Sequence, residues 1–329
     1  MRAGAAMPKG GRSVESKVLV TAAITGAIHT PTMSRYLPVT PKEIIREAVS
    51  ASRAGAAEVH IHARDPKTGY PSSDPSLFAE IVRGIRNESD VLICLTTGGG
   101  QDMTVEERLS VVPRFRPELA SLNMGSMNFG MFPLAGKYKE WKFDWEQPFL
   151  ERTKDFIFRN TFADIERALG IMRESGTKPE LEIYDVGHVY TVLYLKSQGL
   201  LQEPLYLQFV TGILGGIGAS IENLMFLKGT ADRLLGEGSY RWSAIGAGRM
   251  QFPICTAAVL LGGSCRVGLE DNLNMEKGVL AQSNTDQVKK MIRILNELSL
   301  QHATPEEGRG MLGIVPASGL IPSEGRPSA

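Results

Sequence analysis

Apolar runs that resemble buried strands alternate with amphipathic, helix-like runs along most of this chain. Eight strand-like runs occur, at residues 17–26, 57–65, 91–100, 119–130, 180–187, 205–216, 240–248 and 264–272. Stretches with helical spacing follow them, at residues 40–55, 74–89, 104–115, 161–176, 189–199, 220–232, 251–263 and 284–298. Parallel strands that are buried on both faces have this near-continuous apolar character. Eight successive strand–helix units predict an α/β fold, the closed (β/α)8 or TIM barrel.

An open, doubly wound sheet is the alternative arrangement of such units. That fold places a phosphate-binding GxGxxG motif after its first strand, and the segment TAAITGAIH, residues 21–29, contains none. No internal repeat and no change in composition marks a domain boundary. We therefore expect one barrel domain over residues 17–300.

Three segments do not fit the alternating pattern. Residues 1–16 are rich in glycine, slightly basic and without the apolar core of a secretion signal, and we expect a flexible tail there. We expect a C-terminal tail over residues 301–329, loose at its end, GLIPSEGRPSA. The aromatic-rich stretch 131–149, MFPLAGKYKEWKFDWEQPF, is too long for a tight connection. It predicts an insertion after the fourth strand, with a functional or an oligomer-forming role.

Composition narrows the class of protein. Of the 329 residues, 43% are hydrophobic and 22% are charged, which is ordinary for a globular enzyme. Lysine plus arginine and aspartate plus glutamate both number 36, so nothing favours nucleic acid or an anionic membrane as a partner. No apolar run is long enough to span a bilayer. The net charge of zero fits a protein that hides surface in a homo-oligomer. Three cysteines without a CxxC motif indicate a reducing compartment, and we expect a cytoplasmic protein.

Polar side chains gather where the predicted strands end, and in a barrel the active site lies at that end. His60 and His62, two of five histidines, stand at positions i and i+2 of the second strand and face the same side. Two such imidazoles are either half of a metal site or a packed pair. On the eighth strand Glu270 and Asp271 are neighbours, so only one of them can point inward. A carboxylate there could complete a site with the two histidines.

Six motifs in this chain occur in the order found in a known family. They are TAAITGA, HIHARD, TTGGG, LNMGSMNFG, LEIYDVG and RVGLEDN, and the resemblance covers about residues 17 to 300. The set resembles the β-keto acid cleavage enzymes, such as 3-keto-5-aminohexanoate cleavage enzyme. The resemblance implies a zinc-dependent (β/α)8 barrel that converts a β-keto acid and acetyl-CoA into acetoacetate and a new acyl-CoA. By the same resemblance the protein would be a tetramer.

The resemblance also implies a role for individual residues. His60, His62 and Glu270 would bind Zn²⁺, and Asp271 would be the general base with Arg266 beside it. Glu182 matches an active-site carboxylate of the family. The substrate carboxylate would be held by hydroxyl groups and by glycine-rich backbone at the ends of the third and fourth strands, at Thr96, Thr97, Gly98, Gly99, Ser121 and Asn123.

One position departs from the family pattern. Members that act on an aminated substrate carry a glutamate where this chain has Ile28. We therefore expect a β-keto acid with an uncharged, apolar tail. His29 is either a pocket residue or a loop histidine, and His188 and His302 are interpreted as structural. For the phosphates of acetyl-CoA the candidates are Gly215, Gly216 and Arg249, near the ends of the sixth and seventh strands.

Two other functions remain open at this stage. Metal-dependent hydrolases on the same barrel also use an HxH pair, although on the first strand and with further histidines on the fifth and sixth. A catalytically inactive acyl-CoA-binding barrel is the second alternative. Retention of His60, His62, Glu270, Asp271 and Arg266 together argues against it.

Overall fold

The computed structural model describes residues 17–314 as a closed barrel of eight parallel strands. The first strand, β1, pairs with both the second and the last strand of the barrel, which closes the sheet. The predicted (β/α)8 barrel is thus confirmed. The barrel strands are β1 Val20–Ala23, β2 Glu58–Ile61, β5 Leu92–Leu95, β6 Leu119–Asn123, β9 Lys178–Ile183, β10 Leu205–Thr211, β11 Tyr240–Gly246 and β12 Ser264–Val267.

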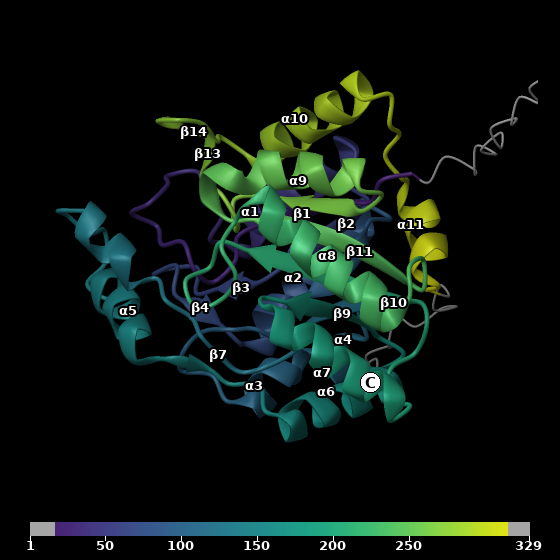
Figure 1. Ribbon diagram of the computed structural model, residues 1–329. Helices are drawn as coiled ribbons and strands as arrows, with labels where there is room; N and C mark the ends of the chain where they lie inside the picture. Colours follow the sequence, from purple (N-terminus) through teal and green to yellow (C-terminus); the bar gives the residue numbers. More distant parts are fainter. Residues whose placement is uncertain (1–16, 315–329) are drawn as a thin grey trace, which may run out of the picture.

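Helices surround the barrel, and their apolar faces pack on the outside of the strands (Figure 1). They begin where the sequence offers caps: Thr40 and Glu43 form a reciprocal capping box at the start of the first helix. The helices of the ring are α1 Pro41–Arg53, α2 Pro75–Glu88, α3 Val105–Leu109, α4 Val111–Phe115, α6 Phe162–Ser175, α7 Val186–Ser197, α8 Ile221–Leu235, α9 Gln251–Leu260 and α10 Asn284–Glu297. The single helix expected over 104–115 is two short ones, because Pro113 has no N–H to donate to Leu109.

The second strand is shorter than expected. The run 57–65 leaves the barrel after Ile61, and β3 (Ala63–Arg64) pairs antiparallel with β4 (Pro71–Ser72). Arg64 is fully buried and anchors this turn. Its guanidinium donates to the carbonyl oxygens of Thr25 and His29 at 2.9 and 2.8 Å, and to that of Gly69 at 2.9 Å. Arg64 thereby ties the loop after β1 to the loop after β2.

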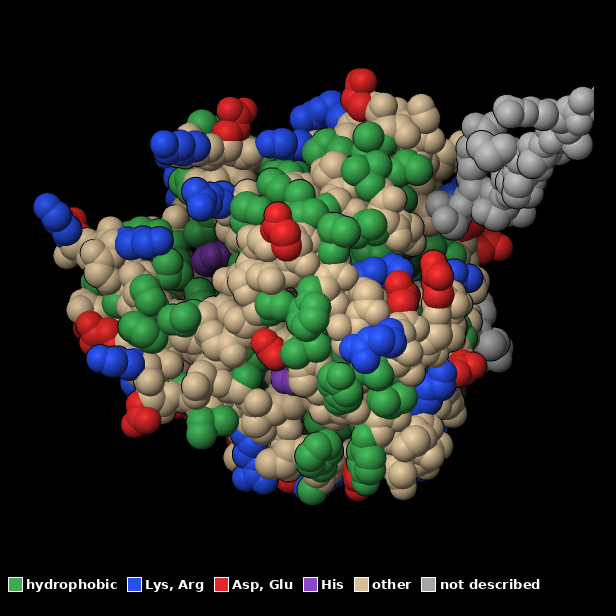
Figure 2. Space-filling model, in the orientation of Figure 1, with side chains coloured by type: hydrophobic (Ala, Val, Ile, Leu, Met, Phe, Trp, Pro, Cys, Tyr) green, Lys and Arg blue, Asp and Glu red, His purple; other side chains and the backbone are tan. Residues whose placement is uncertain are grey.

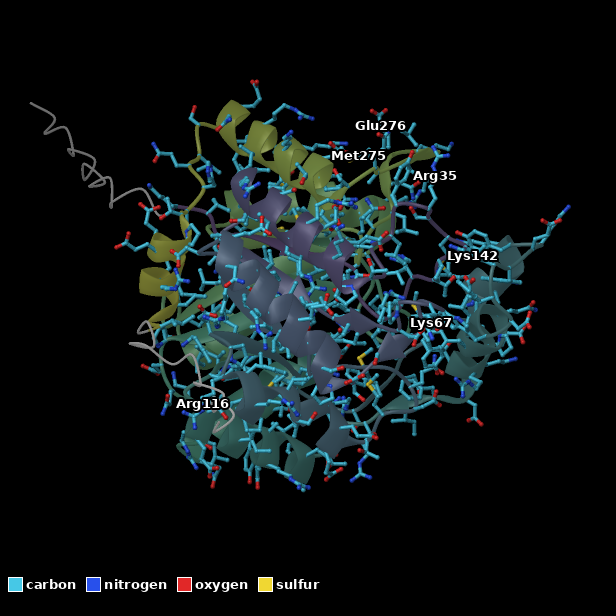
Figure 3. The ribbon with its side chains drawn as sticks, turned by 180° about the vertical axis from the view of Figure 1, so that it is seen from behind. Arg35, Lys67, Arg116, Lys142, Met275 and Glu276 are labelled. Carbon is cyan, nitrogen blue, oxygen red and sulfur yellow. The ribbon has the colours of Figure 1, made fainter. Side chains whose placement is uncertain are left out.

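The insertion forms an arm beside the barrel mouth and extends to residue 158. It contains η1 (Phe132–Lys137), α5 (Glu146–Arg152), η2 (Thr153–Asp155) and β8 (Ile157–Phe158), which pairs with β7 (Met127–Asn128). Figure 3 shows Lys142 on the arm, with Arg35 and Lys67 on the adjoining loops. A small hydrophobic cluster, separate from the main core, packs arm and loops together around Met33, Leu37, Phe149, Leu150, Leu269 and Leu273.

A buried carboxylate locks the arm in place. Glu146 is fully buried and accepts hydrogen bonds from the Thr32 N–H and hydroxyl, both at 2.9 Å, and from the Phe143 N–H at 3.0 Å. The indole N–H of Trp145 donates to the Thr68 carbonyl at 3.1 Å. These contacts fix the insertion to the loops after β1 and β2, so the arm is an integral wall of the mouth.

The expectation of a tail from residue 301 does not describe residues 301–314, which pack on the barrel. His302 forms a bridge with Val18, and Pro305–Leu312 form the helix α11. Gly308 of this helix lies against Leu19 at the base of the barrel, where a Cβ would make a tight contact of 3.1 Å with the Leu19 side chain. Residues 1–16 and 315–329 lie outside the described part.

A hairpin, β13 (Asn274–Glu276) and β14 (Val279–Leu280), follows β12. Among residues 17–314, no helix has the length and apolar character needed to cross a bilayer.

Candidate active site

A pocket opens at the carboxyl ends of the strands. It encloses about 710 Å³, open space at the mouth included. Figure 2 shows a recess between the arm and the barrel body, with a histidine at its base and lysine or arginine side chains around its rim. Side chains of β2, β9 and the loop after β12 form the polar floor, including His60, His62, Glu182 and Glu270. This is the end of the barrel where the sequence placed the site.

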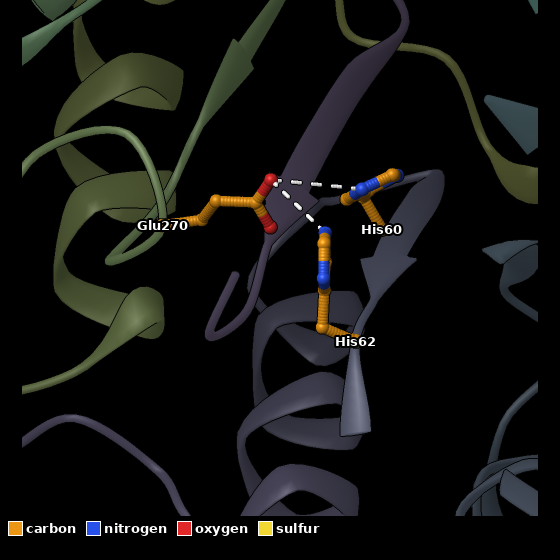
Figure 4. A group of neighbouring side chains, drawn as sticks. All are labelled: His60, His62 and Glu270. Atoms are coloured by element: carbon orange, nitrogen blue, oxygen red, sulfur yellow. Dashed lines mark ion pairs between the residues drawn. The ribbon is translucent and has the colours of Figure 1, made fainter. Parts of the chain in front are cut away.

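His60, His62 and Glu270 converge on one point (Figure 4). The Nε2 atoms of His60 and His62 lie 3.6 and 3.5 Å from the same Glu270 oxygen, Oε1. The ring centroids are 5.1 Å apart. Although the barrel strand ends at Ile61, both imidazoles still face the mouth, as the i, i+2 spacing predicted. Gly26 has a φ of +61°, and a Cβ there would lie 2.4 Å from the Glu270 Cγ, so glycine leaves room for the carboxylate.

These three side chains fit a divalent metal ion. Ligands at about 2.0–2.1 Å in a tetrahedral zinc site are separated by about 3.4 Å, close to the observed 3.5 and 3.6 Å. Burial holds the pKa of His60 well below its ordinary value, which leaves the imidazole neutral, as a ligand must be. The buried Oε2 of Glu270 has no hydrogen-bond partner among the described residues. A cation would satisfy this arrangement of two imidazole nitrogens and one carboxylate.

Arg266 links Glu270 to Asp271. Its Nη2 donates to Glu270 Oε1 at 2.6 Å and to Asp271 Oδ1 at 2.9 Å, and its Nε donates to Asp271 Oδ2 at 2.9 Å. Burial opposes ionisation of Glu270, but the Arg266 guanidinium holds the pKa of this carboxyl well below the ordinary range. Burial raises the pKa of Asp271 to about 6, against the opposing effect of Arg266. The two neighbours thus have different surroundings, but not for the expected reason: both lie in the turn after β12 instead of on the strand, and both contact Arg266.

Glu182 lines the pocket opposite this group. Burial raises the pKa of its carboxyl to about 8, so it is mainly protonated at neutral pH. The Tyr184 hydroxyl donates to Glu182 Oε2 at 3.3 Å. A neutral carboxylic acid in a pocket can donate a hydrogen bond to an anionic oxygen.

The residues proposed for the substrate carboxylate divide into two groups. Thr96, Gly98, Gly99 and Ser121 line the pocket. Thr97 and Asn123 are buried but do not line it, and each donates a side-chain hydrogen bond to a backbone carbonyl. The Thr97 hydroxyl donates to the Ser121 carbonyl at 2.5 Å, and the Asn123 amide donates to the Gly125 carbonyl at 2.9 Å. Their structural contribution is to shape the loops that carry the first group.

The loop after β1 places Ile28 and His29 differently. Ile28 lines the pocket, whereas His29 does not. The Nδ1–H of His29 donates to the Leu269 carbonyl at 2.8 Å. Burial lowers the His29 pKa to about 4, so the ring is neutral at physiological pH. His29 therefore joins the loop after β1 to the loop after β12, just before Glu270. His188, on α7, accepts from the Tyr184 N–H at 3.2 Å, a structural contact.

The candidates for binding acetyl-CoA lie beyond the pocket wall. Gly215 and Gly216 stand in the loop between β10 and α8, packed closely on neighbouring backbone. A Cβ at Gly215 would meet the Asn128 carbonyl oxygen, and one at Gly216 would meet that of Tyr184. Close packing accounts for both glycines without a ligand. Arg249 is exposed in the turn Gly248–Met250 before α9.

Sequence analysis missed the apolar wall of the pocket. It is formed by Phe129, Met131, Phe149, Phe156 and Phe158, with Gln101 and Thr153 as polar neighbours. Phe129 and Phe158 meet edge to face, with ring centroids 5.8 Å apart. The aromatic richness of the insertion was the available signal, but it had been confined to residues 131–149. Three of these five residues lie outside that range.

The (β/α)8 barrel, with two histidines and a glutamate converging at its mouth, has the architecture of an enzyme. The chain belongs to the β-keto acid cleavage enzyme family, whose model matches residues 17–314. It is 50% identical over 300 residues to "3,5-dioxohexanoate:acetyl-CoA acetone transferase" of Paraburkholderia graminis, covering 91% of this chain and 96% of that one. It is 38% identical to "3-keto-5-aminohexanoate cleavage enzyme" of Acetoanaerobium sticklandii, covering 91% and 98%. The resemblance seen in the six motifs is thus confirmed.

A solved structure shares the fold. "Apo structure of ObcA" superimposes with a TM-score of 0.68 at 20% identity, covering 85% of this chain and 66% of that one. At this identity the likeness concerns the barrel alone.

Proposed function

We propose that this protein cleaves a β-keto acid with an uncharged tail in the presence of acetyl-CoA. The products are acetoacetate and the acyl-CoA of the tail. The observation that carries the proposal is the convergence of His60, His62 and Glu270 beside the Arg266–Asp271 pair, in a chain of this family.

His60, His62 and Glu270 would hold the metal ion, and we propose Zn²⁺ because imidazole and carboxylate ligands suit it. When bound, such an ion polarises the ketone and stabilises the enolate charge. The hydroxyls of Thr96 and Ser121 and the backbone of Gly98 and Gly99 orient the substrate carboxylate against it. Glycine permits that close backbone approach.

Asp271 would take a proton from the carbon between the two carbonyl groups. Its Oδ1 lies at most 5.5 Å from the ligand oxygen of Glu270, since both contact the same Arg266 nitrogen at 2.9 and 2.6 Å. Arg266 holds the carboxylate in orientation and offsets its charge. Protonated Glu182 would donate a hydrogen bond to the oxygen of the ketone as negative charge develops there.

The carbon–carbon exchange then follows from the bound groups. The carbanion attacks the acetyl thioester, a C–C bond forms, and CoA leaves as its thiolate. The thiolate adds to the original ketone, and the bond between that carbon and the central carbon breaks. The broken bond leaves its electrons on the central carbon, which is reprotonated to give acetoacetate, and the tail leaves as its acyl-CoA. For the phosphates of CoA, Gly215, Gly216 and Arg249 remain the proposed contacts.

The apolar wall supports an uncharged tail. Ile28 and the five wall residues offer no charge, and the acidic residues that line the pocket are Glu182 and Glu270, on its floor. A buried ammonium would lose hydration without gaining a partner. The relative with 50% identity is named for 3,5-dioxohexanoate, whose tail is neutral. We therefore propose a 3,5-dioxo acid of this kind as the substrate.

The test is an assay of acetoacetate and acyl-CoA formation with zinc-loaded protein, acetyl-CoA and a panel of β-keto acids. We expect turnover of 3,5-dioxohexanoate, with one acyl-CoA formed for each acetyl-CoA consumed. Product formation without acetyl-CoA would instead identify a hydrolase. Absence of turnover across the panel, in protein with full metal content, would contradict the proposal.

A further inference from the structure

One face of α8 (Ile221–Leu235) is exposed and unusually apolar. Glu222, Met225, Phe226, Gly229 and Arg233 are all exposed, and their spacing places them within an arc of about 100° on the helix. Met225 and Phe226 expose 55% and 53% of their surface. We call these five residues the α8 stripe. Its two central side chains are large hydrophobic groups in contact with solvent.

Neighbouring helices extend this apolar face. Tyr190 and Tyr194 of α7 are about half exposed, and Phe162 at the start of α6 packs edge to face on Tyr194. Leu260 at the end of α9 is 64% exposed. Figure 2 shows hydrophobic side chains spread over the face formed by α6 to α9. Soluble monomers rarely expose contiguous apolar areas of this kind, and tyrosine and phenylalanine are enriched where proteins meet.

The charges of the stripe lie at its two ends. Lys228 and Asp232, on the flank of the helix, pair with each other. Among residues 17–314, Glu222 and Arg233 have no such partner within 4 Å. The acidic end and the basic end are eleven residues apart and flank the apolar centre. A partner surface with a basic end, an apolar centre and an acidic end, aligned antiparallel to the stripe, would pair with both of its charged ends.

The positions of these residues along the helix make the stripe complementary to a second copy of itself turned by 180°. We propose that α8 packs antiparallel on α8 of a second copy of this chain, about an axis between residues 227 and 228. In that register Glu222 faces Arg233 of the partner subunit, and Phe226 faces Gly229 of the partner subunit. Each contact occurs twice, as a two-fold interface requires. The missing side chain of Gly229 leaves the space that a phenylalanine ring fills, as a knob fills a hole.

The position of the stripe is compatible with activity. The stripe lies on the outside of the helical ring, whereas the pocket opens at the carboxyl ends of the strands. None of the five stripe residues lines the pocket. The inference does not depend on the proposed reaction.

Sedimentation velocity on the full chain tests the pairing. Wild type should sediment as a dimer of the 35.8 kDa chain or a multiple of it. Glu222→Arg places two arginines opposite each other at both ends, and Arg233→Glu does the same with two glutamates. Each single change should raise the dissociation constant at least tenfold. The double variant Glu222→Arg/Arg233→Glu restores opposite charges and should return it to within about threefold of wild type.

Two further variants complete the test. Phe226→Asp should dissociate the assembly. Glu297→Arg, an equal change of charge at an exposed position of α10, should leave it intact. A monomeric wild type at micromolar concentration, or unchanged assembly in both single variants, would overturn the α8 interface. Failure of the double variant to recover, while circular dichroism shows it folded, would overturn the antiparallel register.

Discussion

The guanidinium of Arg266 donates hydrogen bonds to both carboxylate oxygens of Asp271, each at 2.9 Å, and to Glu270 Oε1 at 2.6 Å. One buried cation thus touches the proposed base and a proposed metal ligand. The base cannot rotate freely, and Arg266 offsets its charge.

Asp271→Asn should abolish most turnover while the fold and the metal content remain. The amide is nearly isosteric with the carboxylate and still accepts one hydrogen bond from Arg266, but it cannot take up a proton. Loss of a general base costs about 10² to 10⁴ in rate. Steady-state kinetics and elemental analysis on the same preparation provide the check. A rate within a few-fold of wild type would place the base elsewhere.

His60→Ala should lose the bound metal. The variant removes one of three converging ligands and leaves two, too few for tight binding. Elemental analysis of protein purified without chelator should show about one equivalent in wild type and a small fraction of that in the variant. His302→Ala, a histidine in the bridge with Val18, is the matched control and should keep its metal. Full occupancy in His60→Ala would refute the ligand assignment.

Ile28→Glu should shift preference toward an aminated substrate. In wild type, kcat/KM should favour a neutral β-keto acid over 3-keto-5-aminohexanoate by at least about a hundredfold, roughly 2.7 kcal/mol. A carboxylate at position 28 supplies the missing counter-charge and should narrow that gap by about tenfold or more. Ile28→Gln has similar size without the charge and should leave the gap nearly unchanged. A wild type that prefers the aminated acid would remove the role assigned to Ile28.

His29→Asn should reduce the loss of folding stability at acid pH. The folded pKa of His29, about 4, lies below the ordinary 6.5, so between those values the unfolded chain binds more protons. Stability must therefore fall as the pH drops from about 6.5 to about 4, by about 2 kcal/mol at pH 5 from this group. Asparagine keeps a donor for the Leu269 carbonyl and does not titrate. Urea unfolding at pH 7 and pH 5 measures the difference, and an equal loss in both proteins would contradict it.

Periodicity was sufficient for the barrel because its strands are buried on both faces and its helices on one. It failed where a single residue changes the path of the chain. Residues 62–64 continue the alternating pattern of β2, yet this segment leaves the barrel sheet, where Arg64 bonds to the Thr25 and His29 carbonyls. Helix α11 is short and rich in glycine, so its packing against Leu19 could not be foreseen from its own composition.

The candidate site also has one part that the sequence predicted and one part that it did not. His60, His62 and Glu270 stand on or next to regular strands, so spacing and motif order were enough to bring them together. Phe149 and Phe158 reach the pocket only because the insertion packs on loops distant in sequence, through contacts such as Glu146 with Thr32. No local pattern encodes such packing, and the wall was therefore missed.

Met131 and Phe149 of the pocket wall belong to a hydrophobic cluster separate from the barrel core, whereas the floor belongs to the barrel. Substitutions at Met131 or Phe149 alter the space offered to a substrate tail while the barrel core and the three converging side chains keep their packing. Selection can therefore vary which acid is accepted without rebuilding the groups that react with it. In this architecture the substrate range and the reaction chemistry can evolve independently.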